Sequence, residues 1–182
     1  MKTLVLYRSQ YGSTEQYARW IGEELAAETD SFDNLKKYDI AEYDLIIVGE
    51  GVYAGQMKAA KRLAPLVEQY PDKRFIFFIV GIADMADQEN RDKLYTDLTK
   101  AMGPAVERVK VFFLRGVLDY AKMGLKHKTM MWLLVKYLQR KPEDELPKDA
   151  DQLIGTYGGR VSFMDKNSIE PLVRYARGES AE

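Results

Sequence analysis

Three aliphatic hydroxyl side chains and one glycine lie close together in the hexapeptide Ser9-Gln10-Tyr11-Gly12-Ser13-Thr14. An apolar run precedes this hexapeptide and a helical pattern follows it, so the loop is expected at the amino end of a helix. A phosphate group at such a place is bound by free backbone N–H groups, by the helix dipole and by hydroxyl groups. We therefore interpret residues 9–14 as a loop that binds a phosphate monoester.

The same residues have a simpler explanation, in which Ser13 or Thr14 caps the helix and Gly12 permits a turn. The position of the loop after the first strand of a predicted parallel sheet favours binding. Arg8 is the only cationic side chain beside the loop, which suits a monophosphate better than a triphosphate. Neither the G-x-x-x-x-G-K-[ST] pattern nor G-x-G-x-x-G is present.

Apolar runs alternate with helical patterns along most of the chain, and three of the runs are almost continuously apolar. Parallel strands that are covered on both faces have this pattern. We therefore predict an α/β fold with a doubly wound, five-stranded parallel sheet and helices on both faces. The predicted strands are Lys2–Tyr7, a short edge strand at Ser31–Leu35, Asp44–Gly49, Arg74–Val80 and Arg108–Leu114. The predicted helices are one ending near Leu25, then Lys58–Gln69, Gln88–Met102 and one near Ile169–Arg177.

Ligands of such sheets bind beyond the carboxyl ends of the strands. Two glycine-containing loops, Gly49–Gly55 and Gly81–Asp87, follow predicted strands and are expected at the same edge as residues 9–14. The three loops together form the predicted site.

Composition narrows the chemistry of this site. The 182 residues include no cysteine and a single histidine, His127. Thiolate chemistry is therefore excluded, and neither a metal site nor a catalytic residue is predicted, so redox chemistry would need an organic cofactor. The chain has no signal-peptide pattern and no apolar stretch of spanning length, so we expect a cytoplasmic protein. We expect a single domain over residues 1–182, in which 115–160 is an insertion-like basic helical segment.

The hexapeptide resembles the flavodoxin phosphate signature, [ST]-x-[ST]-G-x-[ST], except that Tyr11 replaces the middle hydroxyl residue. The resemblance covers roughly residues 1–114 and the last helix, and it implies a flavodoxin-like fold with bound FMN. The implied phosphate ligands are Ser9, Gln10, Gly12, Ser13 and Thr14, and the Tyr11 hydroxyl could donate one further hydrogen bond.

The resemblance also implies that the loops after the next two strands enclose the flavin ring. Tyr53 is the expected stacking partner, because an aromatic side chain gains from offset stacking on another π system. Gly51, Ala54 and Gly81 would let the backbone approach the ring. The alternative for the loop of Tyr53 is an ordinary turn in which this tyrosine lies on the surface. The expected ring contacts are Gly51, Val52, Tyr53, Ala54, Gly55, Gly81, Ile82, Ala83 and Asp84.

Residues 115–141 carry seven Lys or Arg and one Asp, a net charge of +6 in a chain whose net charge is −1. Within this segment apolar residues recur at helical spacing, including Met130, Leu133, Leu134, Tyr137 and Leu138. A basic amphipathic helix of this kind is typical of contact with a membrane surface or a partner. A helix that packs on the sheet remains the alternative. Nucleic-acid binding is not expected, because the basic residues lie on one helix whose charged face has no interleaved aromatic residues.

The stretch Phe112–Tyr120, the basic segment after it and the Gly49-x-x-Val52-x-x-Gly55 pattern are similar to the bacterial menaquinone-dependent protoporphyrinogen IX dehydrogenases. This resemblance implies an FMN oxidoreductase that passes electrons from a porphyrinogen to a membrane quinone. A flavodoxin that only carries electrons is the second hypothesis, although such carriers are generally strongly acidic. A flavin-free interaction module with the same fold is the third.

Overall fold

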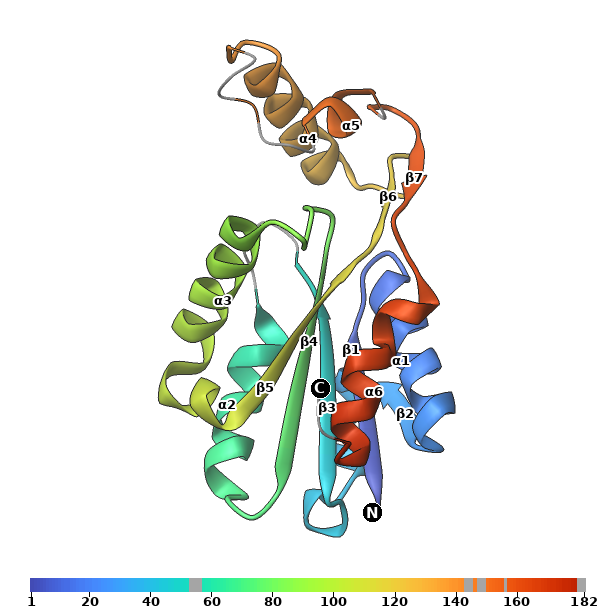
Figure 1. Cartoon of the computed structure of the whole chain (residues 1–182), viewed down its shortest axis with the longest axis vertical. Coiled ribbons are helices and arrows are strands. Elements are labelled where there is room, and N and C mark those ends of the chain that lie inside the picture. Colours follow the sequence, from blue (N-terminus) through green and yellow to red (C-terminus); the bar gives the residue numbers. More distant parts are fainter. Residues whose placement is uncertain (53–56, 143–145, 147–149, 156, 180–182) are drawn as a thin grey trace.

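The computed structural model describes residues 1–52, 57–142, 146, 150–155 and 157–179. Five parallel strands form one sheet in the order β2-β1-β3-β4-β5 (Figure 1). This order, with helices on both faces, confirms the predicted flavodoxin-like α/β fold. The strands are β1 (Thr3–Arg8), β2 (Glu28–Ser31), β3 (Leu45–Gly51), β4 (Arg74–Gly81) and β5 (Val109–Arg115).

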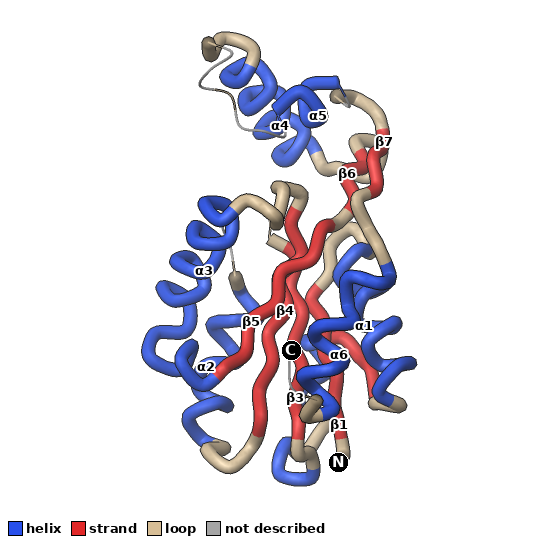
Figure 2. Tube along the Cα trace, in the orientation of Figure 1, coloured by secondary structure: helices blue, strands red, loops and turns tan. Residues whose placement is uncertain are grey.

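Helices cover both faces of the sheet (Figure 2). Helices α2 (Lys58–Gln69) and α3 (Gln88–Met102) cover one face, and α1 (Ser13–Leu25) and α6 (Glu170–Arg177) cover the other. Alternate residues of each central strand enter one of the two cores: Phe77 packs with α2 and α3, whereas Phe78 packs with α1 and α6. Burial on both faces explains why the central strands are almost continuously apolar.

The edge strand predicted at Ser31–Leu35 is wrong by three residues, because the strand is Glu28–Ser31. The Ser31 hydroxyl accepts a hydrogen bond from the Asp33 N–H and starts a 3-10 helix, Phe32–Lys37. The buried Phe32 ring holds that turn against the core. Further 3-10 helices lie at Ile40–Glu42, Gly103–Arg108 and Lys166–Ile169.

A small cap stands over the carboxyl edge of the sheet, and we define it as residues 117–162. Two antiparallel strands, β6 (Val117–Asp119) and β7 (Arg160–Ser162), join it to the rest of the chain. It also contains α4 (Leu125–Leu138) and α5 (Ala150–Gly155), which lie together at the top of Figure 1. Among the described residues, no helix is both long and apolar enough to cross a membrane.

Candidate functional site

The loop between β1 and α1 turns tightly onto the amino end of the helix. Gly12 is the N-cap with φ 95°, a left-handed conformation that favours glycine. Its N–H donates to the Ser9 hydroxyl at 3.0 Å, and its carbonyl accepts the helical hydrogen bond from Gln16 at 3.0 Å. The simpler explanation, in which Ser13 or Thr14 caps the helix, is wrong, since both lie inside it and no side chain caps it. The N–H groups of the first turn therefore have no intrahelical partner.

The hydroxyls of the first turn have different partners. Ser13 Oγ accepts a hydrogen bond from the Val117 N–H at 3.1 Å, so it anchors the start of the cap. Thr14 is fully buried, and its Oγ1 has no hydrogen-bond partner among the described residues. A buried hydroxyl without a partner costs about 1–3 kcal/mol. A phosphate oxygen at this helix terminus would supply that partner, so the loop fits the group expected from the sequence. The Gln10 side chain is exposed.

A pocket opens between the carboxyl edge of the sheet and the cap. Its floor comes from the ends of β3 and β4, one wall from the β1–α1 loop and the chain after β5, and its roof from the cap. The floor and walls are Val52, Val80, Gly81, Ile82, Tyr11, Ser13, Gly116 and Val117, and the roof is Met123, His127, Met130 and Met131. A mostly apolar pocket with a few polar groups can enclose a planar ring.

Several predicted ring contacts lie at this pocket and others lie beside it. Val52, Gly81 and Ile82 line it, whereas Gly51, Ala83 and Asp84 are not among the lining residues. Gly51 is the buried last residue of β3, and the Asp84 carboxylate accepts from the Ala86 N–H at 3.0 Å. Tyr53, Ala54 and Gly55 lie outside the described residues.

Sequence reasoning missed the roof of the pocket and the chain that leads to it. Gly116 is packed closely: a Cβ there would lie 3.1 Å from Val80 Cγ1 and 3.4 Å from Ser13 Oγ. Its N–H donates to the Gly81 carbonyl at 2.7 Å. The methionine content of the basic segment was visible in the sequence, but nothing local indicated that three of its methionines face the sheet edge.

Arg115 joins the loop after β4 to the chain that returns from the cap. Its Nη2 donates to the Ile82 carbonyl at 3.1 Å, and its guanidinium lies 4.0 Å from the centroid of the Phe163 ring. Tyr17 of α1 donates its hydroxyl to the Arg115 carbonyl at 2.8 Å. These contacts fix the entry and exit of the cap beside the pocket.

Glu50 is a buried acid at the end of β3, where the sequence predicted the beginning of a loop. The strand continues to Gly51 because residues 49–51 pair with β4. The Glu50 carboxylate accepts from the N–H groups of Lys58, Ala59 and Ala60, at 2.8–3.2 Å, at the start of α2. Burial raises its pKa, an effect that those N–H groups and Arg8, at 3.4 Å, partly offset. Glu50 therefore holds β3, β1 and α2 together beside the site.

The fold and the site define a doubly wound α/β protein whose candidate site lies where three loops meet at the carboxyl edge of the sheet. The family model described as flavodoxin domain matches residues 4–145. The chain belongs to this flavodoxin family.

Other comparisons give more distant similarities. An uncharacterised protein of Methanocaldococcus jannaschii is 35% identical over 99 residues, which are 52% of this chain, and the chain spans 66% of that relative's length. Among solved structures, a flavodoxin from the domain Archaea is 21% identical with a TM-score of 0.43, covering 63% of this chain and 82% of that one. A flavoprotein from Lactobacillus acidophilus NCFM in complex with FMN is 18% identical with a TM-score of 0.40, covering 63% and 91%.

Proposed function

We propose that this protein is an FMN-dependent oxidoreductase, with the phosphate at residues 9–14 and the flavin ring in the pocket beneath α4. The observation that carries the proposal is the buried Thr14 hydroxyl, which has no partner among the described residues and lies at a helix amino end beside this pocket. Membership of the flavodoxin family supports the choice of cofactor.

Each part of the site then has a physical task. The first-turn N–H groups and the hydroxyls of Ser9, Ser13 and Thr14 bind the phosphate, and Gly12 lets the backbone turn around it. Val52, Val80, Ile82 and the methionines of the roof exclude water from the ring. Bound FMN would supply the electron-transfer chemistry, and no side chain is assigned as an acid or base. Further proposed contacts, from the family pattern, are Gln10, Tyr11, Gly51, Tyr53, Ala54, Gly55, Gly81, Ala83 and Asp84.

Replacing Thr14 by valine should change stability and binding in opposite directions. Valine keeps the shape of threonine but removes the buried hydroxyl, so the apo protein should be as stable as the wild type or up to about 1 kcal/mol more stable. The loss of one hydrogen bond to a charged phosphate should weaken FMN binding by about tenfold or more. Absorption and fluorescence titrations with FMN measure the affinity, and denaturant unfolding of the apo protein measures the stability.

The matched control is Thr99→Val in α3, where the hydroxyl donates to the Tyr95 carbonyl far from the site. This variant should bind FMN as the wild type does. A wild-type protein that binds no FMN would remove the proposal and leave the flavin-free module as the remaining hypothesis.

Within this function, we propose that the electrons pass from a porphyrinogen to a quinone, as in the dehydrogenases that residues 112–120 and the basic segment resemble. The cap supports this choice. Its methionines line the roof of the pocket, so an apolar surface lies above the ring site as well as below it. Turnover of protoporphyrinogen IX with a menaquinone analogue tests it. Loaded protein that exchanges electrons with a one-electron acceptor but oxidises no porphyrinogen would instead be an electron carrier of the flavodoxin type.

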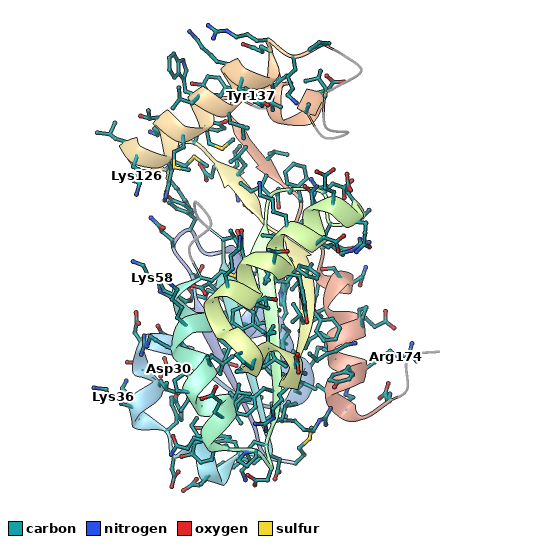
Figure 3. All side chains as sticks on the ribbon, turned by 90° about the vertical axis from the view of Figure 1, so that its left-hand side faces the viewer. Asp30, Lys36, Lys58, Lys126, Tyr137 and Arg174 are labelled. Carbon is teal, nitrogen blue, oxygen red and sulfur yellow. The ribbon has the colours of Figure 1, made fainter. Side chains whose placement is uncertain are left out.

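We also propose that α4 rests on the anionic inner surface of a membrane, which would place a cytoplasmic protein beside its quinone. The helix buries only Val135 and Leu138, whereas Leu133 is 56% and Tyr137 57% exposed. Figure 3 shows Lys126 near one end of α4 and Tyr137 toward the other. The ammonium group of Lys136 lies 4.4 Å from the Trp132 ring centroid. Exposed apolar side chains interleaved with lysines suit the interface of an anionic bilayer.

Replacing Leu133 and Tyr137 together by serine should reduce binding to vesicles that contain phosphatidylserine by about tenfold or more, since each apolar side chain contributes about 1.5–3 kcal/mol when buried. Co-sedimentation measures the bound fraction. Tyr95→Ser in α3 is the control, because Tyr95 is also exposed but lies outside the cap. Equal binding of the wild type to neutral and anionic vesicles, or no binding at all, would contradict the proposal.

A further inference from the structure

The β1–α1 loop and the cap meet directly at Tyr11 and His127. The Tyr11 hydroxyl and His127 Nδ1 are hydrogen-bonded, and the two rings meet edge to face with their centroids 5.8 Å apart. His127 is the single histidine of the chain and lies in the first turn of α4. Tyr11 stands where the flavodoxin signature has a smaller hydroxyl residue, and its side chain reaches α4 of the cap.

Both residues line the pocket, so their contact closes one side of it. The cap is also attached at its covalent entry and exit, where the Val117 N–H donates to Ser13 Oγ and the Phe163 N–H donates to the Gly116 carbonyl at 3.0 Å. The contact between Tyr11 and His127 joins the loop to α4, which also packs with α5 of the cap.

We infer that Tyr11 and His127 form a latch that holds α4 over the bound flavin mononucleotide, so that release of the cofactor requires the latch to open. This inference rests on the proposed function. Both are positioning residues: the latch holds the methionines of the roof against the ring site, and it couples the loop that binds the phosphate to the cap that covers the ring. Loss of the latch should speed dissociation of the cofactor, because opening of the cap then breaks one contact fewer.

The test compares Tyr11→Phe, His127→Leu and the double variant with the wild type. Stopped-flow fluorescence of the loaded proteins, with excess competing apoflavodoxin to trap free FMN, gives the dissociation rates. Each single change should raise the rate about fivefold, as expected for a neutral hydrogen bond. The double variant should be no faster than the faster single variant, because each change breaks the same contact. Tyr95→Phe and Thr129→Val are controls, the latter in α4 but outside the pocket lining.

Two measurements on the apo protein separate the latch from the proposed function. Tyr11→Phe should shift the nitrogen resonances of the single imidazole, and it should speed tryptic cleavage after Lys126 and Lys128 in the first turn of α4. If the wild type binds no FMN but both changes occur, the proposed function fails and the contact stands. Unchanged apo spectra and cleavage would overturn the latch, as would unchanged or additive dissociation rates in proteins that do bind FMN.

Discussion

Replacing Gly49 by alanine should destabilise the protein by about 3 kcal/mol or more, a large part of the total stability of an ordinary domain. A Cβ at this position would lie 2.0 Å from Cζ of Phe78 and within 2.5 Å of two further ring atoms. Gly49 and Phe78 are direct partners on β3 and β4, and the Phe78 ring is fully buried against α1 and α6. The ring therefore has no room to move. Denaturant unfolding followed by circular dichroism measures the loss.

A second change distinguishes this clash from a general effect of alanine. Phe78→Leu should partly rescue Gly49→Ala, so that the double variant is more stable than Gly49→Ala alone, although Phe78→Leu by itself leaves a cavity. Gly124→Ala is the matched control: its φ is −67°, and a Cβ there would meet nothing within 4 Å. A Gly49→Ala protein with the unfolding midpoint of the wild type would contradict the packing described for β3 and β4.

Elements with strong local signals were predicted closely from the sequence. Helix α3 begins after Asp87, whose carboxylate accepts from the Glu89 N–H, and ends before Gly103, whose φ is 60°. Both residues are local signals for a helix end. The edge strand β2 was misplaced because its sequence, Glu-Thr-Asp-Ser, is polar and has no apolar pattern. Its position follows from pairing with β1, which no local pattern records.

The candidate site also has a part that could be predicted from the sequence and a part that could not. The β1–α1 loop and the ends of β3 and β4 could be placed together because carboxyl ends of parallel strands share an edge. The roof could not, because His127 reaches Tyr11 only through the path of the cap, which depends on the β6–β7 ribbon. The sequence also left open whether the basic helix packs on the sheet. The exposed Leu133 and Tyr137 show that this face of α4 does not enter the core.

Replacing Glu50 by alanine should lower the free energy of unfolding by about 3 kcal/mol. Buried N–H groups that lose their acceptor cost about 1–3 kcal/mol, and the loss of a helix cap adds about 1 kcal/mol. The carboxylate is 1% exposed and accepts from three consecutive N–H groups of α2, two of them on the buried residues Ala59 and Ala60. Denaturant unfolding at neutral pH measures the cost. Glu68→Ala, at the exposed far end of the same helix, should change stability by less than about 0.5 kcal/mol.

The variant Glu50→Gln tests whether the folded protein favours the protonated or the ionised form of the Glu50 carboxyl group. Because burial raises the pKa of Glu50 above its ordinary value of 4.5, the folded protein binds the proton more tightly than the unfolded chain. The stability contributed by this group is then fully present below pH 4.5 and is lost as the pH rises through the raised pKa.

The neutral glutamine should therefore cost less than alanine, and the stability advantage of the wild type over Glu50→Gln should shrink as the pH rises across that window. An advantage that instead grows with pH would mean that the N–H groups of α2 and the Arg8 guanidinium outweigh burial and hold the carboxylate ionised. Unfolding curves of both proteins over a series of pH values decide between these effects. The result also determines the charge beside the phosphate loop, because Glu50 pairs with Arg8, the residue that precedes Ser9.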